Sequence, residues 1–186
     1  MPVCVSVRSR AAVGAALVLC LAVAPRVANA GPVLLVGFAE KNGTQLWLPG
    51  IGWRFPVALG ERAERVGQSW RLSPRLLIEP SVAAIAGDAS SIEAQLVPML
   101  ELRPRNERSW QPYGALGVGL AYTAVHGLRL GSELLFSDQV EAGIVTSTSS
   151  GHRLSLAYRF RHLSHAGLWA RTNSGLNAHF LVLSLE

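Results

Sequence analysis

Hydrophobic and polar side chains alternate along much of this chain. The clearest window is Ile92–Arg103, where the even positions are apolar and the odd positions include Glu93, Gln95 and Glu101. The window Arg71–Ala86 repeats the alternation. Because successive side chains of a β-strand point to opposite faces, each window predicts a strand with one apolar and one polar face.

Eight strands of this kind are predicted, separated by polar segments. They cover Val33–Ala39, Leu46–Val57, Arg71–Ala86, Ile92–Arg103, Tyr113–Val125, Ser132–Thr146, Arg153–Ala166 and Leu176–Leu185. Connections such as Gly60–Gln68 and Gly87–Ser91 are rich in glycine, serine and charged residues, which predicts turns and loops. The period of two fits the best windows better than the helical period, so helical alternatives are weak throughout.

The N-terminal segment has the pattern of a secretory signal. The uncharged run Ala11–Ala24 follows two arginines and precedes the small-residue sequence Ala28-Asn29-Ala30. The run is too short to span a bilayer comfortably as a helix, which argues against the alternative of a retained anchor. We therefore expect residues 1–30 to be a cleaved signal peptide and residues 31–186 to form one domain.

Composition then narrows the fold class. The 186-residue chain is 49% hydrophobic with a mean hydropathy of +0.28, yet no later segment has the ~18 unbroken apolar residues of a membrane helix. Only helices and closed β-barrels can span a bilayer, so an apolar, exported chain of alternating strands predicts a closed β-barrel. The expected fold is all-β: an eight-stranded antiparallel transmembrane β-barrel.

Charge and cysteine content exclude several functions. Both cysteines, Cys4 and Cys20, lie in the leader, so no disulfide or thiol chemistry is expected in the mature chain. The leader also holds three of the seventeen basic residues and no acid, which leaves fourteen basic against twelve acidic residues. No run of Lys and Arg with interleaved aromatics appears, so we expect no nucleic-acid binding.

The tryptophans lie mostly near the ends of predicted strands. They are Trp47, Trp53, Trp70, Trp110 and Trp169. This placement fits aromatic girdles at the two membrane interfaces. Ordinary packing of large aromatics explains it equally well. On the interior side of the strand Tyr113–Val125, small residues such as Gly117 and Gly119 would leave room in a narrow barrel.

A histidine and a serine share one face of the strand Arg153–Ala166. His162 and Ser164 continue a row formed by Leu154, Leu156, Tyr158 and Phe160. Their Cβ atoms would be roughly 7 Å apart, which permits a side-chain hydrogen bond. A serine needs a nearby base to become a nucleophile, and a base and nucleophile on an apolar surface suit a lipid substrate. The alternative is a polar girdle at the membrane interface.

Three segments in the C-terminal part of the chain contain sequence motifs that are found together in one protein family. They are His162-Leu163-Ser164-His165-Ala166-Gly167, Asn173-Ser174-Gly175-Leu176-Asn177, and the segment Gly131–Asp138 with its Phe136-Ser137-Asp138. Together they resemble the lipid A 3-O-deacylase (PagL) family, whose patterns are His-x-Ser-Asn-Ala-Gly, Asn-x-Gly-x-Glu and a Phe-x-Asp strand. The resemblance covers roughly the last sixty residues, and before them it amounts to barrel architecture and a signal peptide.

The resemblance implies a specific activity. Members of this family are eight-stranded outer-membrane barrels that hydrolyse the acyl ester at the 3 position of lipid A, within lipopolysaccharide, without metal or cofactor. By position, Ser164 would be the nucleophile and His162 the general base. The oxyanion would be bound by backbone N–H groups near Ala166 and Gly167, with Asn173. The exposed apolar strands would also be compatible with a homodimer.

Two positions depart from the family pattern. Asn177 stands where the family has the glutamate of its triad, and an amide can orient a histidine but cannot stabilise its cation by charge. Asp138 and Glu141 are therefore candidate substitute acids. His165 stands where the family has an asparagine that follows the serine. A metal role for His165 or His179 is not expected, because no metal-binding spacing is present.

Two other functions stay open on these grounds. The first is a non-catalytic small outer-membrane barrel, structural or adhesive, that lost activity through Asn177 and His165. The second is a soluble periplasmic barrel that binds an apolar ligand, against which the outward apolar row of the strand Arg153–Ala166 argues.

Overall fold

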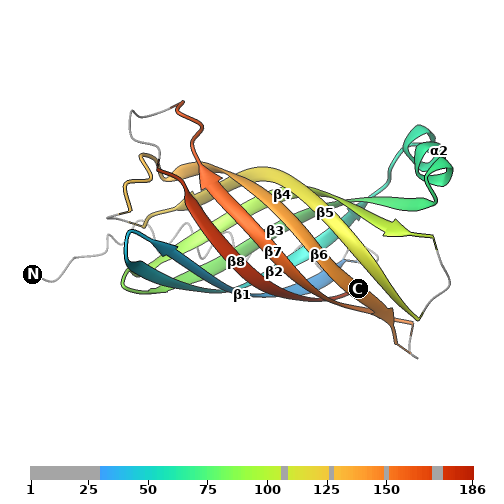
Figure 1. Ribbon diagram of the computed structural model, residues 1–186, viewed down its shortest axis with the longest axis horizontal. Coiled ribbons are helices and arrows are strands. Elements are labelled where there is room, and N and C mark those ends of the chain that lie inside the picture. The colour runs from blue at the N-terminus through green and yellow to red at the C-terminus, as the bar shows by residue number, and fades with distance from the viewer. Residues whose placement is uncertain (1–29, 106–108, 126–127, 149–150, 169–173) are drawn as a thin grey trace, which may run out of the picture.

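Eight antiparallel strands close into a barrel (Figure 1). The structure is a computed structural model that describes residues 30–105, 109–125, 128–148, 151–168 and 174–186. Its elements are β1 (Gly31–Lys41), β2 (Thr44–Val57), α2 (Glu61–Ser69), β3 (Leu72–Gly87), β4 (Ser91–Pro104), β5 (Trp110–Thr123), β6 (Leu134–Ser147), β7 (Arg153–Ser164) and β8 (Leu176–Leu185). The predicted eight-stranded antiparallel barrel is confirmed. The predicted signal peptide lies outside the described residues except for Ala30.

Each strand pairs with its sequence neighbours, and β8 closes the barrel against β1. The closing seam pairs Val33–Ala39 with Ala178–Ser184. Both β1 and β8 therefore lie between two partners, which removes the unpaired edges of an open sheet. We call the end that holds Gly31 and Glu186 the terminal end. The opposite end, with the β7–β8 connection, is called the site end.

The alternation predicted from sequence sets the inner and outer faces of the wall. On β5, Leu116 and Val118 are 60% and 62% exposed, whereas Ala115 is buried. Gly117 faces inward, where a Cβ atom would lie 2.8 Å from a side-chain carbon of Val97 and 2.9 Å from one of Met99. The small residues on this face of β5 therefore leave space for neighbouring interior side chains, as expected.

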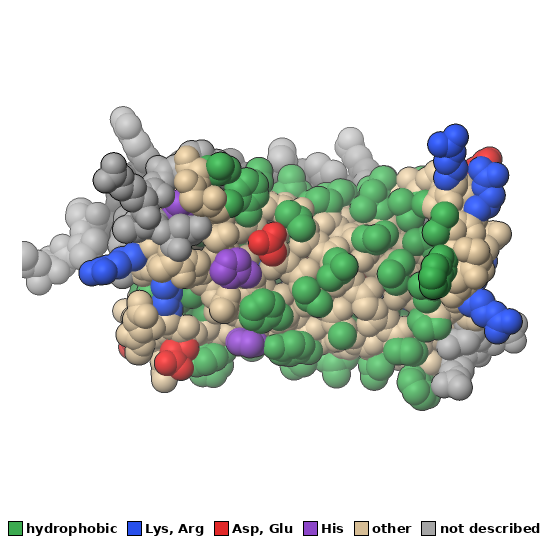
Figure 2. Space-filling model, turned by 45° about the horizontal axis from the view of Figure 1, so that its top comes forward, with side chains coloured by type: hydrophobic (Ala, Val, Ile, Leu, Met, Phe, Trp, Pro, Cys, Tyr) green, Lys and Arg blue, Asp and Glu red, His purple; other side chains and the backbone are tan. Residues whose placement is uncertain are grey.

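The outer face is apolar between the two ends of the barrel. Figure 2 shows this wall covered by hydrophobic side chains, with the basic side chains gathered at the ends. Trp47 lies near the site end and Trp110 near the terminal end, and both are more than half exposed. Their placement at opposite ends of the wall agrees with the girdle interpretation. Trp169 lies outside the described residues.

The barrel interior is filled by ion pairs rather than by apolar side chains alone. Arg54 and Arg159 each contact both Glu79 and Glu141, at distances from 2.6 to 2.9 Å. The Tyr113 hydroxyl donates to Glu141 at 2.7 Å. All five residues are buried. Because every carboxylate faces two guanidinium groups, the cost of burying these charges is offset by paired, hydrogen-bonded contacts.

The prediction for the β2–β3 connection was wrong. Gly60–Gln68 was expected to be a loop, but Glu61–Ser69 forms the helix α2. Ala63, Val66, Gly67 and Trp70 recur at the helical spacing of three and four residues, a stripe too short to stand out against the surrounding alternation. Within the part of the chain that the structure describes, no helix is long and apolar enough to cross a membrane.

Candidate active site

The predicted base and nucleophile lie on the outer face of β7, near the site end. His162 and Ser164 are half-buried, while Arg161 and Leu163 between and beside them are buried inside the barrel. This is the orientation that the alternation predicted. The histidine and serine are therefore open to the hydrophobic surroundings of the barrel rather than to its interior.

His162 is hydrogen-bonded across the strand pair to Asn177. The two residues are direct register partners on β7 and β8, and Nδ1 of His162 lies 2.6 Å from Oδ1 of Asn177. An amide oxygen can only accept, so the bond places the proton on Nδ1. In the neutral ring, Nε2 is then left unprotonated and can act as a base.

Gly175 determines where the His162 ring can lie. Its backbone has a φ of +54°, and a Cβ atom at this position would lie 2.6 Å from Cε1 of His162. Any side chain there would therefore displace the ring. The ring nitrogen Nε2 lies 3.2 Å from the same added Cβ atom, so it is also on the Gly175 side of the ring.

Lys41, at the end of β1, holds this glycine in place. Its ammonium group donates to the carbonyl oxygen of Gly175 and, at 2.6 Å, to Oγ of Ser174. Ser174 in turn donates to the carbonyl oxygen of Arg129 at 2.8 Å. Lys41 was not predictable from the sequence, because its partners lie more than 130 positions away along the chain. For Gly175, the Asn-x-Gly motif was the available signal.

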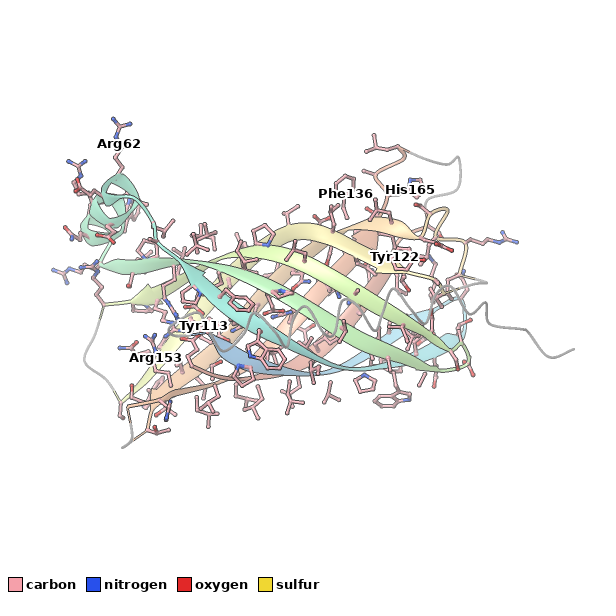
Figure 3. The ribbon with its side chains drawn as sticks, turned by 180° about the vertical axis from the view of Figure 1, so that it is seen from behind. Arg62, Tyr113, Tyr122, Phe136, Arg153 and His165 are labelled. Carbon is pink, nitrogen blue, oxygen red and sulfur yellow. The ribbon has the colours of Figure 1, made fainter. Side chains whose placement is uncertain are left out.

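Ser164 pairs in register with Phe136 of β6. Figure 3 labels Phe136 and His165 at the same end of the barrel, where β6 begins and β7 ends. Among the described contacts, the one that His162 makes is with Asn177, and none joins its ring to the Ser164 hydroxyl. Substrate-free active sites often have long nucleophile-to-base distances that shorten when substrate binds.

The two candidate substitute acids lie on opposite faces of β6. Asp138 is exposed on the outer face and is the register partner of His162 on the side away from Asn177. Glu141 is buried inside the barrel, between Arg54 and Arg159. The expectation that Glu141 is a substitute acid is therefore wrong, because the barrel wall separates it from His162. Figure 2 shows an acidic and a histidine side chain together in the apolar wall near this end.

The residues after Ser164 turn the chain sharply. Ala166 and Gly167 have φ values of +52° and +77°, and the N–H of Leu168 donates to the carbonyl oxygen of His165 at 3.0 Å. Ala166 and Gly167 are exposed, whereas His165 is fully buried. The imidazole of His165 is therefore not open to a substrate on the outer face. Asn173, the third oxyanion candidate, lies outside the described residues.

The sequence matches one family model over most of its length. The model for lipid A 3-O-deacylase (PagL) matches residues 47–186, a range that includes every site residue named above except Lys41. The chain belongs to the lipid A 3-O-deacylase (PagL) family. None of the curated proteins matches the sequence closely enough to count as a relative.

Solved structures show the same fold. The crystal structure of the outer membrane enzyme PagL is 21% identical, with a TM-score of 0.56, over 83% of this chain and 97% of that chain. The crystal structure of Neisserial surface protein A is 11% identical, with a TM-score of 0.57, over 84% of this chain and 93% of that chain. With its family and its apolar outer wall, the protein is an outer-membrane β-barrel. The soluble-barrel alternative is thereby excluded.

Proposed function

We propose that this protein is an outer-membrane serine esterase that hydrolyses the 3-O-linked acyl chain of lipid A. The observation that carries the proposal is the hydrogen bond between His162 and Asn177 on the lipid-facing side of the wall. It orients a base whose free nitrogen is Nε2, and Ser164 lies two residues further along the same face of β7, on a surface that membrane lipids reach without leaving the bilayer. The family of the chain supports the choice of lipid A as substrate.

The proposed reaction proceeds in two halves. Ser164 Oγ attacks the acyl carbonyl carbon while Nε2 of His162 accepts the hydroxyl proton. The tetrahedral intermediate collapses, its bond to the 3-oxygen of the sugar breaks, and the histidine returns the proton to that oxygen. Water then attacks the acyl-serine ester with His162 as base, which releases the fatty acid and regenerates the serine.

The developing negative charge on the carbonyl oxygen needs hydrogen-bond donors. The turn at Ala166 and Gly167 presents exposed backbone directly after Ser164, so its N–H groups are the proposed donors, together with Asn173. No metal or cofactor enters the proposed reaction.

Asn177 is proposed to orient His162 rather than to share its positive charge. It fixes the Nδ1 tautomer as the family glutamate would, but it is neutral. Asp138 is the acidic side chain that the β-sheet register places beside His162, and it supplies negative charge on the outer face. The proposed site therefore divides between two residues what a single glutamate does in the family pattern.

The deciding experiment is a mass spectrum of lipid A from cells that express the wild type, Ser164→Ala or Asn177→Glu. We expect loss of the 3-O-linked chain with the wild type, no loss with Ser164→Ala, and at least as much loss with Asn177→Glu. Heat-modifiable migration on gels shows that each barrel is closed. An unchanged acylation pattern with a closed wild-type barrel would favour the non-catalytic alternative.

The signal peptide is proposed on the sequence pattern of residues 1–30. N-terminal sequencing of protein extracted from the outer membrane is expected to begin at Gly31. A sequence that begins at the initiator methionine would contradict cleavage. The homodimer also stays a proposal, and cross-linking in the membrane is its direct test.

A further inference from the structure

Helix α2 lies against the outside of the barrel wall, at the terminal end. Its one buried residue, Gly67, packs on β3. A Cβ atom at Gly67 would lie 2.4 Å from Cδ of Pro74, so the helix backbone rests directly on that ring. Pro74 lies two and four residues before the outward-facing Leu76 and Ile78, so it is on the same outer face of β3. The contact with Pro74 therefore places α2 on the lipid side of the wall. Figure 1 shows the helix standing out sideways from the barrel.

The helix exposes large apolar side chains that no neighbour covers among the described residues. Val66 is 60% exposed, and Trp70, which caps the C-terminal end of the helix, is 74% exposed. With Ala63 and Gly67 they form a single stripe at positions i, i+3, i+4 and i+7. Through Gly67, this stripe joins the outer surface of the barrel at Pro74, in the outward-facing row of β3 that also holds Leu76 and Ile78.

The polar side of α2 carries charges of both signs. Arg65 lies opposite the stripe with Glu61, Glu64 lies near them, Arg62 lies beside Val66 at the spacing i, i+4, and Arg71 follows Trp70 at the C-terminal end. Arg62, Arg65 and Arg71 are all exposed. Figure 3 shows Arg62 pointing away from the barrel. Long arginine side chains can lie along an apolar boundary and reach phosphate groups with their charged ends. Tryptophan prefers the same boundary, because its ring is apolar and its N–H is polar.

We propose that α2 is an interfacial helix that docks on the phospholipid headgroup layer at the terminal end of the barrel. Val66 and Trp70 enter the boundary between headgroups and acyl chains, and the arginines bind headgroup phosphates. The occupant of the exposed stripe is the bilayer, because the stripe is continuous with the wall that the bilayer already covers. The inference rests on the outer-membrane location and is independent of the proposed esterase activity.

The test compares two labelled positions on α2 in the full chain with Cys4→Ser and Cys20→Ser. Val66→Cys places an environment-sensitive fluorophore on the stripe, and Gln68→Cys places the same fluorophore on the opposite side of the helix. The barrels are reconstituted in vesicles of phosphatidylethanolamine and phosphatidylglycerol that contain a lipid with a headgroup-level nitroxide quencher. We expect quenching at position 66 to exceed quenching at position 68 by at least about threefold.

A second pair of measurements separates lipid from other occupants. Arg62→Gln with Arg65→Gln is expected to reduce quenching at position 66 in anionic vesicles, while heat-modifiable migration stays unchanged. Equal quenching at the two labelled positions would overturn the proposal. So would shielding of position 66 that persists in detergent and rises with protein concentration, because that result would identify a second copy as the occupant.

Discussion

Asp138 and Asn177 flank His162 from opposite sides, one on each neighbouring strand. Both are register partners of the histidine, Asp138 on β6 and Asn177 on β8. Only Asn177 is hydrogen-bonded to the ring, whereas Asp138 carries the charge. This arrangement underlies the proposal that two residues share the orientation and the charge that one carboxylate can provide together.

Replacing Asn177 by glutamate should raise kcat by about tenfold. A carboxylate at this position can keep the hydrogen bond to Nδ1 and also stabilise the imidazolium that forms as Ser164 loses its proton. A gain of one pKa unit in that stabilisation is about 1.4 kcal/mol. The measurement is the rate of fatty-acid release from purified lipid A. The matched control is Asn177→Gln, which keeps the amide and should not exceed the wild type.

Replacing Asp138 by asparagine should lower kcat, and the size of the loss should depend on residue 177. We expect a clear loss of kcat in the wild-type background and rescue by Asp138→Glu. The loss should be smaller in the Asn177→Glu background, because the carboxylate at position 177 would also stabilise the positive charge of His162. The four rates form a double-mutant cycle. Equal losses in both backgrounds would show that Asp138 acts independently of the histidine charge.

Gly175→Ala should abolish most activity while the barrel still closes. The added Cβ atom would overlap the His162 ring, at 2.6 Å from Cε1. Gly151→Ala is the matched control, because Gly151 also has a positive φ (+83°) but no atom within 4 Å of an added Cβ. Both variants place a side chain at a positive φ, and the φ of Gly151 is the less favourable of the two, so a larger loss of fatty-acid release in Gly175→Ala isolates the contact with the ring. Similar activities in the two variants would argue against this role for Gly175.

Glu79→Gln should destabilise the barrel by about 3–5 kcal/mol. The change leaves Arg54 and Arg159 inside the wall with one carboxylate between them instead of two. The midpoint of urea unfolding in lipid vesicles measures the loss. Glu61→Gln on the exposed helix α2 is the control and should stay within about 0.5 kcal/mol of the wild type.

Acid should weaken the terminal end through Glu186. Burial raises the pKa of this carboxyl, but the attraction of Arg75 and Arg103 outweighs burial and holds the pKa below its ordinary value of 4.5. A depressed pKa contributes stability that is complete above the ordinary value and is lost as the pH falls through the lowered one. Unfolding midpoints at pH 7 and pH 3 should therefore differ less in Glu186→Gln than in the wild type.

The alternation along the sequence predicted the fold well, because a membrane wall with a polar interior imposes a period of two on every strand. The predicted strand Leu176–Leu185 agrees with β8 at both ends. The same alternation could have excluded Glu141, which lies three positions from Asp138 and must face the other way. Helix α2 escaped prediction because its apolar stripe spans only two turns and adjoins no other helical pattern.

The site was predictable only in part. The family resemblance brought together His162, Ser164 and Asn177, and the structure places all three on the outer face at one end. Lys41 and the interior ion pairs escaped prediction, because they depend on contacts between strands far apart in sequence. Arg54, Glu79, Glu141 and Arg159 come from four different strands, and their meeting is a result of barrel closure.

The seam between β1 and β8 makes completion of the wall depend on pairing between its first and its last strand. Until Ala178–Ser184 meets Val33–Ala39, both strands keep unpaired backbone groups, which cost several kcal/mol each in a bilayer. The same closure brings Lys41 to Gly175 and so fixes the glycine beside His162. A chain caught halfway through insertion therefore has neither a sealed edge nor an ordered base. The proposed esterase activity would begin only when assembly ends.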